Sequence, residues 1–452
     1  MKSTEILPLR HQAKIRNRWL KERLETILPA VMDREGFDMW IVTAREYNED
    51  PVIMSLLPEP MMSARRRTIL VFYKRPGVEA RVNSKVESAM EPGGVAGFRV
   101  EPGAGSEQPD CADPALAVEN LIIARSGVVL EGLYQAAWPL DEPDQWQALK
   151  QVVEQRDPKS IGINISKTFA FGDGLTYTEY MRLMETLGPK YQERAESAER
   201  LAVGWLETRT PDEIRAYTGI VRICHQIVEE VFSRRVILPG VTTPSDVAWW
   251  MRQRIHDMGL NPWFQPSVDA QRSGAGFADS DLPILPGDLL HCDVGFYYLG
   301  LASDIQQNAY VLKPGEEAAP AGLVSALATG NRMQDIVMGQ MARGRTGNEI
   351  LRDSLNEAKA EGIKGSVYCH PIGYHGHAAG PTIGLWDRQE GVPGQGDYEL
   401  FDDTCHSLEL NIRQAIPEWN GQEVRMALEE DIVYTGGEVY LLDGRQKRLH
   451  LI

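Results

Sequence analysis

The sequence predicts two domains, a smaller α/β domain over residues 1–205 and an α+β domain over residues 206–452. The length of 452 residues exceeds the roughly 250–300 residues at which a single hydrophobic core stops growing. Short apolar runs alternate with helical stretches in the first half, which is typical of an α/β domain. Near residue 205 a new pair of helix starts appears and strand-like runs follow, so the domain boundary is placed there.

The first domain is predicted from a helical stretch and two buried strands. Residues 16–32 have a helical pattern, whereas residues 37–45 and 69–73 are short apolar runs typical of strands. The same alternation continues through residues 152–166 and the helix-like residues 176–188. No cluster of metal-binding residue types occurs in this half, so we interpret it as a structural or substrate-gating domain.

Two helix starts open the second domain. Thr210 is placed to cap a long amphipathic helix, with Pro211 and acidic residues in its first turn. After a Pro-Gly turn, a Thr/Ser/Asp start predicts another helix that ends at Gly259. We expect strand-like runs separated by turns beyond that glycine.

Composition and charge narrow the range of partners. Apolar residues make up 43% and charged residues 25% of the chain, which is ordinary for a folded globular protein. The net charge of −17 repels phosphate backbones and anionic lipid, so neither nucleic acid nor a membrane surface is expected as a partner. No run of about 18 apolar residues occurs, so no membrane span is predicted.

The cysteines and the N-terminus indicate a cytoplasmic protein. The N-terminal residues are polar and lack the apolar segment of a signal peptide. The cysteines form no C-x-x-C pair, and an odd number of them cannot be fully paired within one chain, so a reducing compartment is expected. They are Cys111, Cys224, Cys292, Cys369 and Cys405.

Two aspartates lie on a predicted antiparallel hairpin, in PGDLLHCDVGFYYLGLASDIQQNAYVL. If the turn centres on Tyr298 and Leu299, Asp293 and Asp304 are direct cross-strand partners with Cβ atoms about 5 Å apart. Carboxylates so close repel each other, and a divalent cation between them would allow both to stay ionised. The alternative is a pair of solvated acids on an exposed hairpin.

Three of the nine histidines fall within eight residues, in CHPIGYHGH: His370, His375 and His377. Imidazole is the commonest metal ligand and a ready proton donor. Gly373 and Gly376 between them permit a close backbone approach. Spacing alone does not decide which histidine binds metal, and a histidine-rich surface loop is the alternative.

Two glutamates on predicted strands complete the set. In CHSLELNI, Glu409 alternates with apolar neighbours and lies on the face opposite His406 and Leu408. In VRMALEEDIVYT, Glu429 shares the polar face, whereas Glu430 shares the apolar face, so Glu429 is the better ligand. Either glutamate taken alone would more often be a solvated side chain.

Together these segments supply four carboxylates and an imidazole. Such an oxygen-rich set suits manganese, cobalt, iron or zinc more than copper or a thiolate-bound structural zinc. Two such ions held close together can activate water and polarise a carbonyl group. The residues therefore predict a dinuclear metal hydrolase.

The order of these residues resembles that of the pita-bread metallopeptidases, which include aminopeptidase P, prolidase and methionine aminopeptidase. The segment DVGFYYLGLASD is similar to the family's D-x-G followed by the second aspartate, and HPIGYHGHAAGP is similar to its H-x-x-G-L-x-x-H-E-x-P. SLELN and LEEDIVYT resemble the two glutamate segments. The resemblance covers the whole chain and implies a creatinase-type N-terminal domain over 1–205 and a pita-bread catalytic domain over 206–452.

The resemblance also implies roles for single residues. His377 would steady the carbonyl or tetrahedral oxygen, and Glu409 would carry a proton from water to the leaving amine. The cofactor would be two divalent metal ions, manganese first, with cobalt, zinc or iron as alternatives. The metal ligands would be Asp293, Asp304, His370, Glu409 and Glu429.

Three positions depart from the family pattern. Ala427 stands where aminopeptidase P and prolidase commonly have arginine, and Arg425 is a candidate substitute. The segment VDAQRSGAGFADSD lacks the histidine that family members have before the hairpin, and Ser366 replaces another histidine. These departures bear on substrate preference more than on metal binding.

The expected function is hydrolysis of the N-terminal or sole peptide bond of short peptides, with proline after the scissile bond. Such an enzyme would be an Xaa-Pro aminopeptidase or dipeptidase, and the resemblance implies a homodimer. One alternative is a non-catalytic binding protein that retains the fold. Another is a creatinase-like hydrolase of a small C–N bond, although creatinase itself lacks the metal ligands.

Overall fold

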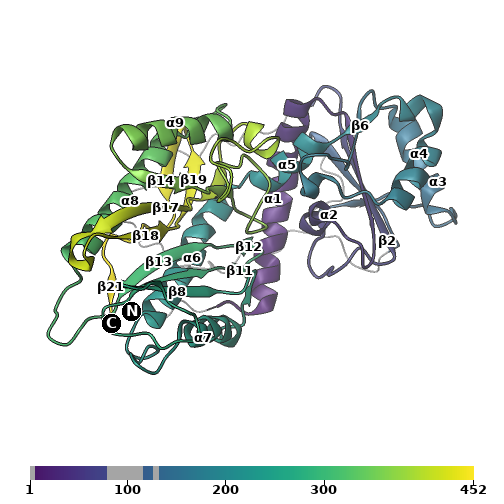
Figure 1. The fold of residues 1–452 in the computed structure, drawn as a ribbon. Helices are drawn as coiled ribbons and strands as arrows, with labels where there is room; N and C mark the ends of the chain where they lie inside the picture. The colour runs from purple at the N-terminus through teal and green to yellow at the C-terminus, as the bar shows by residue number, and fades with distance from the viewer. Residues whose placement is uncertain (1–5, 79–115, 126–131) are drawn as a thin grey trace. The chain divides into compact units, whose positions relative to one another are not determined.

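The computed structural model describes residues 6–78, 116–125 and 132–452, and these fall into two compact units (Figure 1). One unit spans Leu7–Thr210 and the other contains Pro211–Ile452. The division coincides with the start of a helix at Pro211. Cys111, one of the five cysteines of the sequence, lies outside the described residues.

The N-terminal unit is a mixed sheet with helices, in the strand order β4-β3-β2-β1-β5-β6. Strand β1 pairs antiparallel with β2 and parallel with β5. The predicted helix at 16–32 lies within α1, and the predicted strands at 37–45 and 69–73 correspond to β1 and β2, so these expectations are confirmed. The elements are α1 (Leu9–Glu35), β1 (Met39–Arg45), α2 (Pro51–Leu56), β2 (Arg67–Lys74), β3 (Val118–Ile123), β4 (Gln135–Ala136), α3 (Gln145–Arg156), β5 (Ile161–Ile163), the 3-10 turn η1 (Ala170–Gly172), α4 (Tyr177–Gln192), β6 (Ala195–Ser197) and α5 (Glu199–Glu207).

Both predicted helices at the start of the C-terminal unit are present, as α6 (Pro211–Val231) and α7 (Pro244–Asp257). Thr243 caps α7 in a reciprocal capping box with Asp246. Gly259 follows that helix with a φ of 76°, a left-handed conformation that glycine adopts readily. Within the described part of the chain, no helix has the length and apolar character needed to cross a bilayer.

Two further helices occupy the region where only strand-like runs were expected. They are α8 (Ala321–Gln340) and α9 (Gly347–Ala360). Helix α9 begins with a capping box between Thr346 and Glu349, a signal that was present in the sequence. Helix α8 follows Pro320 without a side-chain cap and is rich in small residues, so it offered a weaker signal.

The remaining chain forms four small sheets, in the orders β21-β13-β10-β8-β9, β12-β11-β7, β14-β17-β18 and β15-β16-β19-β20. Their mixture with helices is the α+β architecture that was predicted for this half. The elements are β7 (Asn261–Pro262), β8 (Ser267–Arg272), β9 (Gly276–Phe277), β10 (Leu289–Val294), β11 (Phe296–Tyr298), β12 (Leu301–Ala302), β13 (Ile305–Tyr310), β14 (Lys364–Val367), β15 (His370–Pro371), η2 (Gln395–Asp397), β16 (Thr404–Ser407), β17 (Leu410–Ile416), η3 (Pro417–Trp419), β18 (Gln422–Leu428), β19 (Asp431–Thr435), β20 (Glu438–Leu441) and β21 (His450–Leu451).

The hairpin around Gly300 is present, but its turn lies one residue later than expected. Tyr298 pairs with Leu301, so the turn consists of Leu299 and Gly300, both with positive φ. Two such residues make the tight turn that matches the twist of paired strands. As a consequence Asp293 lies opposite Gln306, and the predicted direct pairing of Asp293 with Asp304 is wrong. The two aspartates are diagonal neighbours on one face.

The two glutamate strands are each broken at the glutamate. Strand β16 ends at Ser407 and β17 begins at Leu410 in a different sheet, and β18 and β19 are divided in the same way around Glu429. The prediction of one continuous alternating strand through Glu409 is therefore wrong. The two breaks lie side by side, because the backbone N–H of Leu408 in one break donates to the carbonyl oxygen of Glu430 in the other at 2.9 Å.

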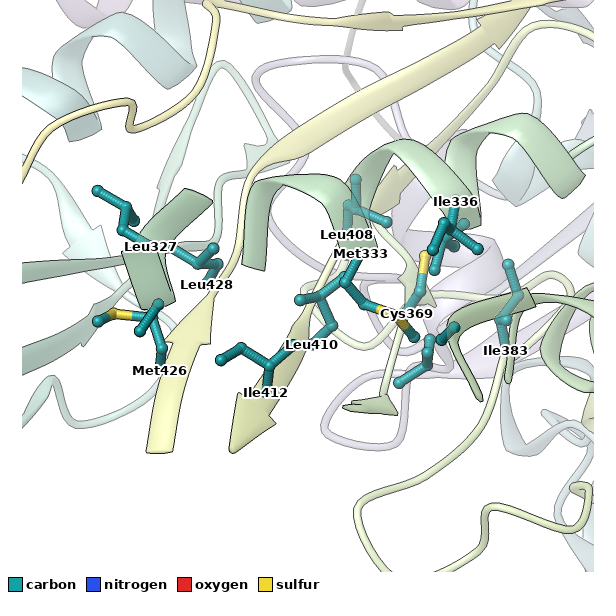
Figure 2. Close-up of a cluster of buried hydrophobic side chains, with 14 of the residues drawn as sticks. Leu327, Met333, Ile336, Cys369, Ile383, Leu408, Leu410, Ile412, Met426 and Leu428 are labelled. Carbon is teal, nitrogen blue, oxygen red and sulfur yellow. The ribbon is translucent and has the colours of Figure 1, made fainter. Parts of the chain in front are cut away.

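An apolar core lies directly beneath these sheet changes (Figure 2). Helix α8 contributes Leu327 and Met333, which pack with Leu410 and Leu428 from β17 and β18. Full burial of each such side chain contributes about 1.5–3 kcal/mol to folding. Cys369 and Leu408 belong to the same core, so it anchors the backbone immediately before His370 and Glu409.

Candidate metal centre

Three side chains converge in the C-terminal unit with the geometry of a metal site. Asp304, His370 and Glu429 each offer a ligand atom, and these atoms lie within 4.8 Å of one another. His370 Nε2 is 3.6 Å from Asp304 Oδ2 and 3.6 Å from Glu429 Oε1, beyond hydrogen-bonding distance. All three residues are buried.

Each of the three comes from a different local structure. Asp304 lies between β12 and β13, and its backbone N–H donates to Asp431 Oδ2 at 3.1 Å. His370 opens β15. Glu429 sits at the change of sheet, where its backbone forms a bridge with Gln306 of β13. The site is thus assembled where strands meet.

The ligand atoms are buried without partners of their own. Among the described residues, none forms a hydrogen bond with Asp304 Oδ1, His370 Nε2 or Glu429 Oε2, and the same holds for Asp293 Oδ1. Buried polar atoms are almost always paired, so such a group indicates an absent ligand. These atoms therefore fit a bound cation.

Neighbouring contacts orient the ligands. His370 Nδ1 donates to the carbonyl oxygen of Pro371 at 3.0 Å, which leaves the Nε2 lone pair facing the carboxylates. Ser407 Oγ donates to Glu429 Oε1 at 2.6 Å and leaves Oε2 available. A backbone or hydroxyl partner of this kind is the usual support for a metal ligand.

The electrostatics point the same way. Burial, and then the charges of Glu429 and Glu409, raise the pKa of Asp293 well above its usual range. Burial, Glu429 and Asp293 do the same to the pKa of Asp304. Burial alone would lower the pKa of His370, but Glu429 and Glu409 outweigh it and raise that pKa. A cluster of acids that disfavours its own ionisation is stabilised by a divalent cation.

The other two predicted ligands lie beside this group of three. Asp293 is in β10, with Gln306 as its register partner. Glu409 accepts a hydrogen bond from Gln306 Nε2 at 2.9 Å. Burial and the charge of Glu429 raise the pKa of Glu409 to about 8. The charge of Glu409 in turn contributes to the raised pKa of Asp293.

His377 lies next to His370 without joining the group of three. The two imidazole rings are 4.7 Å apart between centroids, edge to face. Tyr368 Oη is 3.2 Å from His377 Nε2, and the indole of Trp263 lies 5.1 Å from the His377 ring. Burial, then the charge of His370, lower the pKa of His377 to about 4, so the imidazole is neutral near pH 7.

Several contributors to the site were not anticipated from the sequence. Tyr368, Ser407 and Gln306 contact predicted site residues but carry no pattern that would single them out. Asp431 follows two residues after Glu429 and was not among the predicted ligands. Its burial, together with a backbone donor from Asp304, emerges from the tertiary structure.

The positions that depart from the family pattern are also placed. Ala427 is buried in β18. Arg425, two residues before it, lies with Nη2 3.9 Å from Asp269 Oδ2. Its charge acts to lower the pKa values of Asp293 and Glu409. Arg425 thus supplies positive charge near the site.

A buried carboxylate–histidine centre on this α+β unit is what a metallopeptidase contains, and residues 217–435 match the family model of Metallopeptidase family M24. The matched residues make up just under half of the chain and lie within the C-terminal unit. The recognition of a pita-bread metallopeptidase from the motifs is thereby confirmed.

One curated protein is similar to part of this chain. A "Putative Xaa-Pro aminopeptidase" of Mycoplasma pneumoniae is 31% identical over 112 residues, which are 24% of this chain and 31% of that protein. The match thus spans about a third of the length of this curated relative.

Solved structures extend the likeness to nearly the whole chain. The X-Pro aminopeptidase from Thermotoga maritima has a TM-score of 0.59 at 14% identity and covers 93% of this chain and 99% of its own. The Xaa-Pro dipeptidase from Bacillus anthracis has a TM-score of 0.58 at 16% identity and covers 97% and 100%. At such identities the likeness shows the fold, and it confirms the predicted fold class.

Proposed function

We propose that this chain is a metal-dependent exopeptidase that cleaves the N-terminal or sole peptide bond of short peptides with proline after the scissile bond. Its cofactor would be two divalent ions, manganese first, with cobalt, zinc or iron as alternatives. The observation that carries the proposal is the convergence of Asp304, His370 and Glu429, whose buried ligand atoms lack partners within the described residues.

The proposed ligand set is the one expected from the sequence. Asp293 and Glu409 would extend the group of three to a second ion, since both border it and both are coupled to Glu429 by charge. Bound divalent ions would supply Lewis acidity toward the peptide carbonyl and toward water. Four carboxylates and one imidazole offer the hard oxygen ligands that such ions accept.

Two residues would handle the proton and the developing charge. Glu409 borders the group of three, so its carboxylate would take up a proton from water and return it to the leaving amine. His377 is neutral near pH 7 and lies beside His370, so its imidazole can donate to the oxygen that gains charge in the transition state. Tyr368 would hold that ring in place.

The preference for proline is supported by aromatic surface next to the reacting groups. Trp263 packs edge-on against His377, and Phe264 lies 4.4 Å from Trp263 between ring centroids. Flat apolar rings of this kind suit a prolyl side chain. Two proteins of the same fold, the X-Pro aminopeptidase from Thermotoga maritima and the Xaa-Pro dipeptidase from Bacillus anthracis, are named for this preference.

The test is a substrate screen on protein that has been stripped with chelator and refilled with manganese, cobalt or zinc. Xaa-Pro dipeptides and Xaa-Pro-Xaa tripeptides would be compared with the matching Xaa-Ala peptides. We expect hydrolysis only after refilling, and faster hydrolysis of the proline series.

The outcomes separate the alternatives. Tight metal and peptide binding without hydrolysis of any peptide would favour a non-catalytic binding protein that retains the fold. Equal rates on the alanine and proline series would retain the peptidase and reject the proline preference. Hydrolysis that survives exhaustive chelation would reject the metal-dependent mechanism.

A further inference from the structure

A chain of buried and partly buried hydrogen bonds leads away from Glu409 through residues to which the proposed function gives no role. Gln306 Nε2 donates to Glu409 Oε1 at 2.9 Å. Gln306 Oε1 lies 2.8 Å from His291 Nε2, and His291 Nδ1 lies 2.9 Å from Asp269 Oδ2. These contacts join β8, β10 and β13 of one sheet to the break between β16 and β17.

Gln306 is the hub of this chain. Its backbone forms a reciprocal pair of hydrogen bonds with Glu429, each 3.2 Å long, and its register partner across the sheet is Asp293. The side chain reaches Glu409. One residue therefore contacts three of the five proposed ligands, and its own burial leaves it little freedom to move.

His291 contacts the Gln306 amide on the side away from Glu409. A carboxylate accepts hydrogen bonds only, so it needs the NH₂ end of the amide rather than the oxygen. The contact between Gln306 Oε1 and the His291 ring leaves the NH₂ end of the amide on the side of Glu409. Asp269 on the far side of the ring orients His291 in turn, as carboxylates do for imidazoles in metal sites.

We propose that Gln306, held by His291 and Asp269, is a positioning residue that fixes the Glu409 carboxylate for metal binding and proton transfer. This inference rests on the proposed function, since it assigns Glu409 the role given there. The chain ends at Arg425, whose Nη2 lies 3.9 Å from Asp269 Oδ2. Gln306, His291 and Asp269 touch neither substrate nor ions and act through Glu409.

The adjacent residue provides a matched control. Gln307 is also buried, and its Nε2 donates to a glutamate, Glu430, at 3.2 Å while its Oε1 accepts from His450 at 2.8 Å. It therefore bridges a glutamate and a histidine just as Gln306 does, but on the other face of β13. Any loss due only to removing a buried amide from this strand should appear in both variants.

The first measurement is cobalt binding to the full chain. Gln306→Leu and Gln307→Leu would be stripped of metal and titrated with Co²⁺, with the visible absorption spectrum reporting the ligand geometry. We expect Gln306→Leu to weaken binding of an ion about 10- to 100-fold, the usual effect of losing a residue that supports a ligand, and to change the spectrum. Gln307→Leu should match the unsubstituted protein in both respects.

A third variant, Asp269→Asn, keeps the test informative if Gln306→Leu misfolds. Asp269→Asn preserves the shape of a partly exposed side chain and removes only the charge behind His291. We expect it to shift the cobalt spectrum in the same direction as Gln306→Leu, by less. Thermal unfolding of all three variants would show whether Gln306→Leu and Gln307→Leu lose comparable stability.

Kinetics on an Xaa-Pro peptide add the second readout. Gln306→Leu should lower kcat about 10-fold or more with KM unchanged, because Glu409 acts in the reaction step rather than in peptide binding. Equal cobalt affinity and equal spectra in the Gln306 and Gln307 variants would overturn the inference. If the unsubstituted protein binds cobalt but cleaves no peptide, the proposed function fails while the cobalt comparison still decides this one.

Discussion

Glu429 and Glu430 are neighbours in the chain and equally buried, yet they belong to opposite kinds of charged cluster. Glu430 Oε2 is 2.7 Å from His225 Nε2, and the other nitrogen of that ring is 3.0 Å from Asp443 Oδ2. Gln307 and the backbone N–H of Gln446 donate to the remaining Glu430 oxygen. That cluster is complete within the protein.

Glu429 faces a histidine and an aspartate as well, but at 3.6 Å from the imidazole and with Oε2 unpaired among the described residues. The two clusters contain the same chemical groups. Hydrogen bonds pair the groups around Glu430, which we call the closed cluster. The group around Glu429 contains ligand atoms that are unpaired among the described residues, and we call it the open cluster. Buried acids alone therefore do not mark a metal site, whereas several unpaired ligand atoms that lie close together fit one.

The largest expected effect comes from His370→Ala. The substitution removes the only nitrogen ligand of the group of three, so metal affinity should fall more than about 100-fold, beyond the 10- to 100-fold that losing a supporting residue costs. His225→Gln, in the closed cluster, should retain its metal. Elemental analysis after dialysis checks both, and equal metal content in the two variants would remove the distinction between the clusters.

The next effect tests whether His377 belongs to the metal-binding group or only lies beside it. His377→Ala should lower kcat about 10²- to 10³-fold, the usual result of losing one donor to the transition-state oxygen, while the metal content stays intact. Steady-state kinetics and metal analysis on the same preparation provide the check. Loss of metal from the His377 variant, with retention in the His370 variant, would exchange their roles.

The features of the fold and site that could be predicted are those encoded within short stretches of sequence. The α+β and α/β units, the helix starts at Pro211 and Thr243, and the hairpin with its two aspartates all depend on short-range patterns, and the structure contains them. The register of the hairpin did not follow. Sequence placed the turn one residue early, and only the positive φ of Leu299 and Gly300 reveals it.

Long-range features lay beyond the reach of these patterns. Glu430 was assigned to an apolar face by alternation, but it is a paired acid whose partner His225 is 205 residues away in the chain. Alternation also assumed continuous strands through Glu409 and Glu429, whereas the chain changes sheet at both. Alternation preferred Glu429 to Glu430 as a ligand, and Glu429 lies with Asp304 and His370. The physical reason is that the two glutamate side chains point in opposite directions where the chain changes sheet.

Removing metal should destabilise the open cluster in a pH-dependent way. The pKa values of Asp293, Asp304 and Glu409 are raised in the folded state, to about 8 for Glu409. Such acids make the folded protein less stable as the pH rises from about 4 through their folded-state pKa. The metal-free protein should therefore be less stable at pH 8 than at pH 5.

Added manganese should reverse that loss, by about 2.7 kcal/mol at 100 times its dissociation constant. Urea unfolding with and without chelator at the two pH values provides the measurement. At one fixed manganese concentration, the stabilisation should be larger at pH 8, where the acids are ionised and bind the ion more tightly. A stabilisation that is equal at pH 5 and pH 8 would contradict the repulsion between these acids.

The smallest expected effect tests the closed cluster, whose pH response extends to a higher pH than that of the open cluster. Burial alone would lower the pKa of His225, but hydrogen bonds from its ring to Asp443 and Glu430 outweigh burial and raise the pKa to about 10. Arg222 also binds Asp443. A cation with a raised pKa contributes stability that is fully present below its unfolded value of about 6.5 and is lost as pH rises through 10.

His225→Gln should accordingly lower the free energy of unfolding by about 2 kcal/mol at pH 6, less than the 3–5 kcal/mol typical of a broken buried ion pair, because glutamine can still donate one hydrogen bond. The difference from the unsubstituted protein should shrink steadily between pH 7 and pH 10, since the imidazolium loses its proton there. Urea unfolding of the two metal-free proteins at pH 6, 8 and 10 measures it. A constant difference across that range would mean that His225 is held as a neutral ring, and the closed cluster would then owe its stability to hydrogen bonding without an ion pair.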